Sequence, residues 1–291
     1  MKKFKNLKVT LILLSFLVFL TPNSVLADAY DTNNAFNKKE GSEEAFNLAQ
    51  KIADDKIKIR KVDSPVTENL QAVGRFTNVK ADMSGTAVAI GDYTILTNNH
   101  LVEDEVTKKG QRNYRSAAPN ELKFYPMQSS KETPYSFSIK NVHMIKGVDL
   151  AVVHTNKKIS DKIKPINMAS EDDIKSLKYN DKISVAGYAK TKYFESRFPE
   201  LTKIKYPQLF KTDGFYLNKA KTTEPQFYIN AILRKGNSGS PIINSNGELI
   251  GTFVNGFNNS GASSFEYNVE EMGYGVALTD DVRQEVLENT K

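Results

Sequence analysis

Short apolar runs bounded by turn-forming residues recur through most of the chain, and long amphipathic stretches are few. Residues 85–90 and 93–96 are two such runs, and the pair Gly91-Asp92 between them predicts a hairpin. Two further strands are expected within 136–153, and another over 183–188. This spacing of short strands and turn residues predicts an all-β architecture.

Helical patterns are confined to the two ends. From Ser42, a good N-cap residue, apolar residues recur at helical spacing at Ala45, Leu48, Ala49 and Ile52. A second helix is expected over 280–290, where Thr279 can cap the first turn and the apolar side consists of Val282, Val286 and Leu287.

Three polar stretches are harder to assign. Residues 28–62 form an N-terminal extension that is either a retained surface helix or a propeptide removed on activation. Residues 103–130 are basic and polar, and we expect an exposed loop there. Residues 191–213 combine Lys, Pro and aromatic residues, which is typical of an exposed recognition loop or of a twisted hairpin with core aromatics; we favour the hairpin.

Residues 1–27 have the pattern of a signal peptide. Four lysines precede an almost wholly apolar run over 9–20, and Val25-Leu26-Ala27 supplies small residues at the spacing of a cleavage site. The apolar run is too short for a helix of about 20 residues that would span a bilayer. We therefore expect an extracellular protein that has no membrane contact after the signal peptide is removed.

The net charge and the absence of cysteine exclude several kinds of site and partner. Removal of residues 1–27 lowers the net charge from +6 to +2, so charge gives no reason to expect a nucleic-acid partner. The chain has no cysteine, which excludes a disulfide framework and thiolate zinc sites. Its three histidines have no metal-ligand spacing. We expect no cofactor, no metal and a monomer.

The strongest chemical signal is the stretch Gly236-Asn237-Ser238-Gly239-Ser240-Pro241, between an apolar run and a predicted hairpin. Glycines on each side can present the Ser238 hydroxyl and turn successive N–H groups toward one point. Acyl transfer needs such a nucleophile beside donors for a developing oxyanion. The plain alternative is a Gly/Ser/Pro turn between two strands.

A serine nucleophile needs a base and a group that orients the base. His100 follows a strand pattern, and Asp149 begins another apolar run. His143 and His154 are rival bases, but each lies within a strand-like run, so His100 is preferred. The order His100, Asp149, Ser238 along the chain is one of the known orders of a catalytic triad.

Three segments carry a family resemblance: Leu96-Thr97-Asn98-Asn99-His100, Gly147-Val148-Asp149-Leu150-Ala151 and Gly236-Asn237-Ser238-Gly239-Ser240. They resemble the active-site segments of staphylococcal glutamyl endopeptidases and exfoliative toxins, which are cysteine-free secreted relatives of trypsin. A composition rich in Lys and Asn also suits a Gram-positive bacterium.

The resemblance implies a chymotrypsin-like double six-stranded β-barrel, with a serine protease domain over 63–291. Barrel one would span about 66–165 and barrel two about 167–279, with the C-terminal helix packed on barrel two. It also implies an oxyanion hole made by the N–H groups of Gly236 and Ser238. In exfoliative toxins an N-terminal helix contributes to substrate recognition, which is a third interpretation of residues 28–62.

The pocket for the residue before the scissile bond (P1) departs from the family pattern. Glutamyl-specific members have Thr and His at the positions of Leu233 and Phe253, where they hydrogen-bond the substrate carboxylate. A carboxylate buried without donors would be unstable by several kcal/mol. Leu233, Phe253, Val254 and Gly256 therefore predict an apolar P1 preference, unless Arg234 or Lys235 turns inward and restores the preference for Glu.

Two functions follow. The first is a secreted serine endopeptidase that hydrolyses peptide bonds of a protein or peptide substrate through His100, Asp149 and Ser238, in the manner of an exfoliative-toxin-like virulence factor. The second is a catalytically latent or silent homologue that acts by binding a host protein.

Overall fold

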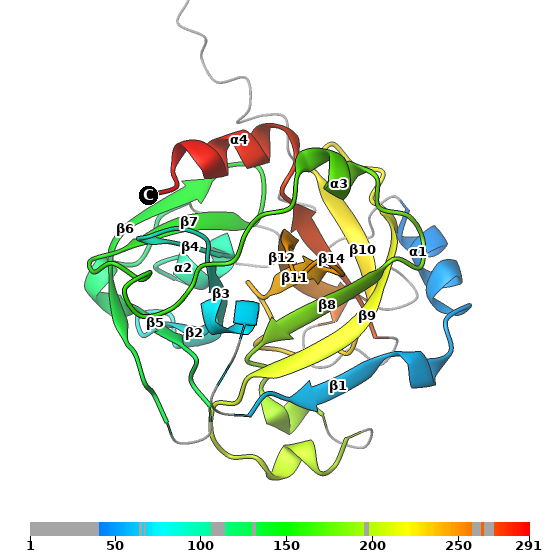
Figure 1. Cartoon of the computed structure of the whole chain (residues 1–291), viewed down its shortest axis with the longest axis horizontal. Coiled ribbons are helices and arrows are strands. Elements are labelled where there is room, and N and C mark those ends of the chain that lie inside the picture. Colours follow the sequence, from blue (N-terminus) through cyan, green and yellow to red (C-terminus); the bar gives the residue numbers. More distant parts are fainter. Residues whose placement is uncertain are drawn as a thin grey trace, which may run out of the picture.

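Two β-barrels lie side by side in the computed structural model (Figure 1). The structure describes residues 41–63, 66, 68–105, 114–129, 132–194, 198–257, 263–264 and 271–291. The expected signal peptide at 1–27 and the basic run Lys108-Lys109-Gly110-Gln111-Arg112 lie outside the described residues. The prediction of an all-β double barrel with a helix near each end is confirmed.

Barrel one is a closed antiparallel ring of six strands in the order β2-β3-β4-β7-β6-β5. Its strands are β2 (Val73–Asn78), β3 (Met83–Ala89), β4 (Thr94–Thr97), β5 (Leu122–Pro126), β6 (Phe137–Ile145) and β7 (Leu150–Thr155). The predicted hairpin is confirmed, because Val88 of β3 lies opposite Leu96 of β4. The exposed loop expected over 103–130 is wrong at β5, where the alternating residues Leu122 and Phe124 are fully buried.

Barrel two is a second ring, in the order β8-β9-β10-β14-β12-β11, closed by the pairing of β11 with β8. Its strands are β8 (Lys182–Gly187), β9 (Phe210–Lys219), β10 (Gln226–Asn230), β11 (Pro241–Asn244), β12 (Leu249–Phe257) and β14 (Met272–Ala277). The short β13 (Ser263–Ser264) pairs with β12 outside the ring.

The remaining elements are short. The helices are α1 (Ser42–Ala49), α2 (Asn99–Val102), α3 (Glu171–Lys175) and α4 (Asp280–Glu288). The 3-10 turns are η3 (Asp54–Lys56), η4 (Glu68–Ala72), η5 (Pro119–Glu121), η6 (Thr191–Tyr193) and η7 (Leu201–Lys203). The hairpin favoured for 191–213 is wrong, since its described residues form η6, η7 and the start of β9. The expected core aromatics are present: the rings of Phe194 and Phe210 are buried, with centroids 5.3 Å apart.

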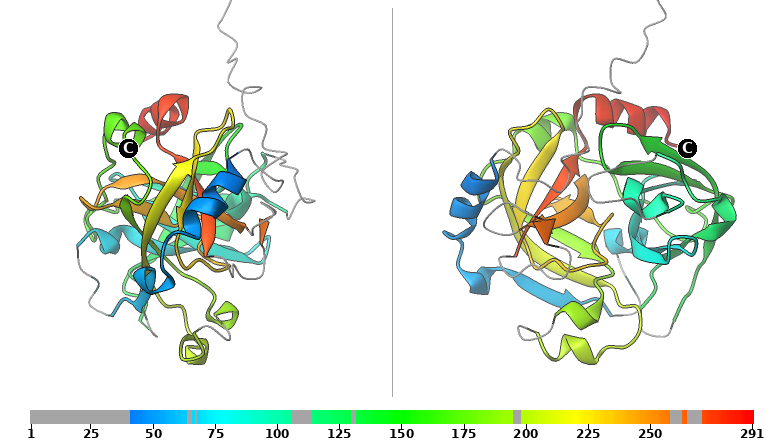
Figure 2. Two further views of the ribbon diagram at one scale, coloured as in Figure 1. Left: turned by 90° about the vertical axis from the view of Figure 1, so that its right-hand side faces the viewer. Right: turned by 180° about the vertical axis from the view of Figure 1, so that it is seen from behind.

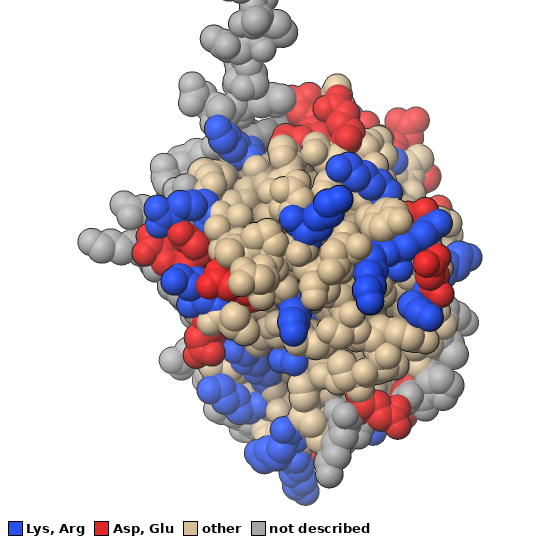
Figure 3. All heavy atoms as spheres, turned by 90° about the vertical axis from the view of Figure 1, so that its left-hand side faces the viewer, with Lys and Arg blue, Asp and Glu red and all other residues tan. Residues whose placement is uncertain are grey.

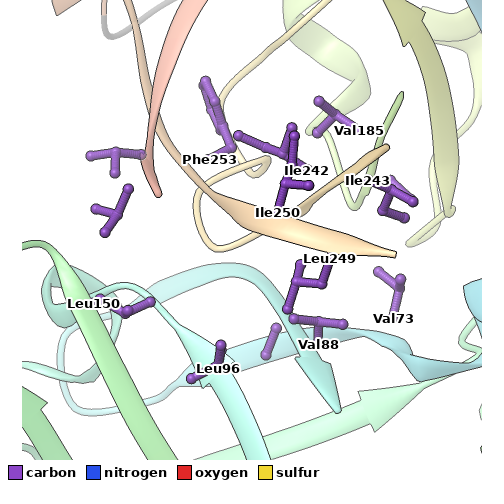
Figure 4. Close-up of a cluster of buried hydrophobic side chains, with 14 of the residues drawn as sticks. Val73, Val88, Leu96, Leu150, Val185, Ile242, Ile243, Leu249, Ile250 and Phe253 are labelled. Atoms are coloured by element: carbon purple, nitrogen blue, oxygen red, sulfur yellow. The ribbon is translucent and has the colours of Figure 1, made fainter. Parts of the chain in front are cut away.

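An apolar interface joins the two barrels (Figure 4). Side chains of barrel one face side chains of β11 and β12 across it; those labelled in the figure include Val73, Val88, Leu96, Leu150, Ile242, Leu249 and Ile250. All of these side chains are buried, and each contributes about 1.5–3 kcal/mol relative to an exposed position. This interface fixes the barrels against each other, and the site described below lies at their junction.

The N-terminal segment belongs to the folded body. The strand β1 (Lys58–Lys61) pairs antiparallel with β9, with Lys58 opposite Asp213 and Lys61 opposite Phe210. The protease domain expected from the sequence begins at residue 63. That boundary would separate β1 from the sheet to which β1 adds a strand. Helix α1 packs on β9 and β10 with Ala45 fully buried, and its N-cap is Gly41 at a φ of 87°, not Ser42.

The C-terminal helix α4 is confirmed, but its packing on barrel two is wrong. Its polar contacts reach barrel one: His143 Nε2 donates to Glu285 Oε1 at 2.6 Å, and His154 Nε2 donates to the Asn289 carbonyl at 2.7 Å. Figure 2 shows α4 across the top of barrel one. Val282 and Val286 are buried as predicted, whereas Leu287 is 49% exposed.

The surface on the barrel-one side has no dominant charge (Figure 3). Lys and Arg side chains are scattered among neutral residues, and acidic side chains gather at the top, where α4 lies. Among the described helices, none is long and apolar enough to cross a membrane.

We expect the segment that contains α1 and β1 to contribute measurably to stability. A chain that begins at Asp63 loses the β1–β9 pairing and should unfold at a lower temperature than one that begins at Asp28. Ala45→Glu places a charge in a fully buried position and should lower the free energy of unfolding by about 2 kcal/mol, or about 4–8 °C in melting temperature.

Thermal unfolding followed by circular dichroism measures both effects, with the exposed Glu43→Ala as the control. Equal melting temperatures for the two chain lengths would mean that the segment is only loosely attached.

Candidate active site

The three segments singled out in the sequence meet at the junction of the barrels. His100 lies on α2 directly after β4, Asp149 precedes β7, and Ser238 lies in the turn between β10 and β11. Nδ1 of His100 donates to Oδ2 of Asp149 at 2.7 Å, and the backbone N–H of His100 donates to Oδ1 at 3.1 Å. A Cβ on Gly85 would touch both the side chain of Leu101, next to His100, and the carbonyl oxygen of Ser238 at 2.9 Å.

Two buried asparagines hold the histidine turn against the aspartate loop. The Asn98 side chain donates to the Asp149 carbonyl at 2.8 Å, and the Asn99 side chain donates to the Val148 carbonyl at 2.7 Å. Asp149 is 2% exposed, and its carboxylate accepts the Nδ1 proton of His100, so it selects one imidazole tautomer. In that tautomer Nε2 is unprotonated and can act as a base.

The turn Gly236-Asn237-Ser238-Gly239, called the serine turn below, has a backbone conformation that depends on glycine. The N–H of Asn237 donates to the Arg234 carbonyl at 3.0 Å, and the Asn237 side chain accepts from the Arg234 N–H at 2.9 Å. Gly236 has a φ of 103°, and a Cβ there would overlap the Tyr188 carbonyl oxygen. A glycine is therefore required at position 236.

Two backbone donors flank the Ser238 side chain. The carbonyl of Lys235 accepts from the Lys190 N–H at 2.7 Å, and because the peptide group is planar this turns the Gly236 N–H away from Lys190. In the described part of the chain, neither the Gly236 N–H nor the Ser238 N–H donates to a protein acceptor. The turn thus leaves two N–H groups available to an outside acceptor.

Thr86 of β3 ties the serine turn to barrel one, and sequence reasoning missed it. Its N–H donates to the Ser238 carbonyl at 2.8 Å and its hydroxyl donates to the Gly236 carbonyl at 2.9 Å. Its own carbonyl accepts from the Thr97 hydroxyl at 2.7 Å, three residues before His100. The sequence offers one sign of this role, a polar residue inside the apolar run 85–90. That sign is weak as long as the hydrogen-bond partners of Thr86 are unknown.

The Ser238 hydroxyl donates to the Val254 carbonyl at 3.3 Å. Among the described contacts there is no hydrogen bond between Ser238 and His100. Catalytic hydrogen bonds are often long or misaligned before substrate binds, so this orientation alone does not decide activity.

The residues predicted to form the P1 pocket lie beside the serine turn. Leu233, Phe253 and Val254 are 1%, 3% and 2% exposed, and Gly256 is buried. A Cβ on Gly273 would lie 2.5 Å from Phe253 Cε2 and 2.7 Å from Leu233 Cδ1, so these two side chains meet at Gly273. Two buried apolar side chains therefore lie next to each other beside the serine turn.

Arg234 is neutralised by an acid that sequence reasoning did not find. Its guanidinium makes a bidentate ion pair with Glu271, at 2.8 and 2.9 Å, and both side chains are 2% exposed. The Nε of Arg234 also donates to the Tyr193 carbonyl at 3.0 Å. A buried, hydrogen-bonded pair of this kind is strongly destabilised when one partner is removed. Arg234 therefore stabilises the start of the serine turn.

The rival histidines lie elsewhere, since His143 and His154 contact α4 and its C-terminal end. Among the described residues, no cluster of His, Asp and Glu could hold a metal ion.

Comparisons with known proteins identify the fold and the family. The trypsin family model matches residues 60–270. A solved structure of a Glu endopeptidase in complex with MPD aligns with a TM-score of 0.60 and 17% identity, over 79% of this chain and 95% of that chain. The Rv3671c protease in its inactive form aligns with a TM-score of 0.50 and 16% identity, over 77% of this chain and 91% of that chain. At these identities the solved structures show the fold, and the family model shows the family. The chain belongs to the trypsin-like serine protease family.

Proposed function

We propose that the protein is a secreted serine endopeptidase in which Ser238 is the nucleophile, His100 the general base and Asp149 the orienting acid. The observation that carries the proposal is the 2.7 Å hydrogen bond from His100 to the buried Asp149, at the junction where Thr86 holds the Ser238 turn. Ser238 attacks the scissile carbonyl while His100 takes its proton, and His100 then protonates the leaving amine. Asp149 stabilises the imidazolium that forms between these steps.

The oxyanion of the tetrahedral intermediate binds the N–H groups of Gly236 and Ser238. Two observations support this oxyanion hole. Both N–H groups lack an acceptor among the described residues, and the Lys190 N–H holds the Lys235 carbonyl away from Ser238. A hole built in advance stabilises the charge as it develops, without reorganising the turn. In the proposed cycle, the Ser238 hydroxyl leaves the Val254 carbonyl and donates to His100 once substrate binds.

An apolar P1 residue is favoured over Glu. The donors that a glutamate carboxylate needs are absent from Leu233 and Phe253, and the guanidinium of Arg234 is already occupied by Glu271. Lys235 is also turned aside, with its Nζ 5.9 Å from the centroid of the Tyr193 ring. The proposed enzyme thus keeps the chemistry of the glutamyl endopeptidase and exfoliative toxin group with a different specificity.

The alternative is a latent homologue that acts by binding. It is favoured by one observation, the hydrogen bond that holds the Ser238 hydroxyl on Val254. The buried Asp149–His100 pair favours the enzyme, because it lies at the junction that carries the Ser238 turn, whereas the carboxylate-paired His143 lies against α4.

Secretion is proposed from the signal-peptide pattern of residues 1–27, which makes an extracellular protein or peptide the expected substrate. A role in virulence is proposed only through the resemblance to exfoliative toxins. Monomeric behaviour is proposed as well, and size-exclusion chromatography of the chain from Asp28 tests it.

Ser238→Ala should lower kcat/KM for a cleaved peptide by roughly four to six powers of ten, and Asp149→Asn by about four, because each removes a member of the proposed triad. Steady-state hydrolysis of a fluorogenic peptide measures both. Ser245→Ala, an exposed serine in the β11–β12 turn, is the matched control and should keep wild-type activity. Activity that survives in Ser238→Ala would refute the assignment of the nucleophile.

A peptide library scanned at P1 should show preferred cleavage after apolar residues. The double variant Leu233→Thr/Phe253→His supplies hydrogen-bond donors and should shift the ratio of Glu to Leu cleavage by about tenfold or more toward Glu. Wild-type cleavage mainly after Glu would keep the nucleophile but contradict the apolar pocket. A library left wholly uncleaved would support the latent homologue.

A further inference from the structure

Two lysine ammonium groups lie over one tyrosine ring beside the serine turn, and a third lysine is hydrogen-bonded to one of these two through the backbone. The Nζ of Lys192 lies 4.9 Å from the centroid of the Tyr193 ring, and the Nζ of Lys235 lies 5.9 Å from the same centroid. Lys190 joins them through its backbone hydrogen bond to the Lys235 carbonyl. We call Lys190, Lys192 and Lys235 the lysine cluster.

The lysine cluster is not neutralised by ion pairs within the described residues. None of its three ammonium groups makes an ion pair with a described carboxylate. Burial lowers the pKa of Lys190, and repulsion from Lys235 lowers it further; Asp82 acts in the opposite direction but has the smallest effect. Like charges are therefore gathered at a point where an added anion would relieve their repulsion.

Its position relative to the reaction centre is defined by the hydrogen bonds of the serine turn. On one side the turn binds β12, where the Gly239 N–H donates to the Phe253 carbonyl at 2.9 Å. On the other side it binds Lys190, whose N–H donates to the Lys235 carbonyl at 2.7 Å. The proposed P1 pocket lies on the β12 side. If the P1 side chain enters that pocket, the lysine cluster, on the other side of the turn, is the place we assign to the residues after the scissile bond.

We propose that the lysine cluster recognises acidic side chains immediately after the scissile bond, at the P1′ and P2′ positions of the substrate. This inference rests on the proposed function and deepens it: the substrate class becomes a segment with an apolar P1 residue followed by Asp or Glu. The exposed Lys192 and Lys235 contact the carboxylates directly. Lys190, which is partly buried, strengthens the local positive potential.

The ordinary role of an exposed lysine is solvation, and scattered lysines need no further explanation. Two features separate this cluster from that role. The ammonium groups of Lys192 and Lys235 lie over one ring, and Lys190 and Lys235 adjoin the turn that carries the proposed nucleophile. Repulsion among the ammonium groups of the lysine cluster destabilises the free protein. Substrate carboxylates would offset this destabilisation.

The test uses three fluorogenic peptides that share an apolar P1 residue and differ only at P1′ and P2′, with Glu-Glu, Gln-Gln or Lys-Lys. The wild-type chain should give a kcat/KM about three- to tenfold higher for Glu-Glu than for Gln-Gln, with Lys-Lys lowest. The triple variant Lys190→Gln/Lys192→Gln/Lys235→Gln should bring the ratio between Glu-Glu and Gln-Gln close to one. High salt should also reduce the ratio, because exposed charges are screened.

Two controls separate the possible failures. Lys182→Gln, an exposed lysine on β8, should keep the wild-type ratio. Binding of the same peptides to Ser238→Ala, measured by fluorescence anisotropy, reports recognition without catalysis and should also favour Glu-Glu.

Equal cleavage of the three peptides, or a preference that persists in the triple variant, would overturn the inference while the proposed function stands. If no peptide is cleaved, the proposed function fails; tighter binding of Glu-Glu would then still support the lysine cluster, and equal binding would overturn it.

Discussion

The hydrogen bonds of Thr86 hold together the two halves of the site. His100 is supplied by barrel one and Ser238 by barrel two, and Thr86 lies fully buried between them. Its backbone and hydroxyl bind the Ser238 turn, while its carbonyl binds Thr97 at the end of β4. Its hydroxyl also accepts from the Tyr188 N–H at 3.0 Å, which brings in the segment that leads to Lys190. A single residue thus aligns both barrels through its backbone and its side chain, and the apolar interface around it supplies the rigidity.

The serine turn shows how polar groups are used in this junction. Gly236 admits a conformation that a Cβ would block, and Asn237 closes the turn from within. The buried ion pair between Arg234 and Glu271 stabilises the start of the turn. Such a pair is a weak source of stability but is costly to break, so it favours a single arrangement of the turn. The same pair keeps the guanidinium away from a substrate carboxylate, so that the support of the turn and the proposed specificity are linked.

Much of this arrangement could be predicted from local sequence patterns. The hairpin at Gly91-Asp92, the two terminal helices and the three segments around His100, Asp149 and Ser238 each depend on neighbouring residues. The features that sequence analysis missed depend on distant partners. Strand β1 is polar because it lies at an edge of the sheet, and Glu271 acquires its meaning only opposite Arg234, 37 residues away. Helix α4 contacts barrel one because His143 and His154 meet it there, which no local pattern could indicate.

The central claim is that Ser238 is a nucleophile activated by His100, and covalent labelling tests it most directly. A fluorophosphonate probe reacts with an activated serine and leaves a mass adduct that peptide mapping can locate. A single adduct is expected on Ser238 in the chain from Asp28, lost in His100→Ala and kept in Ser245→Ala. Absence of an adduct on Ser238, or an adduct that forms equally well without His100, would contradict it.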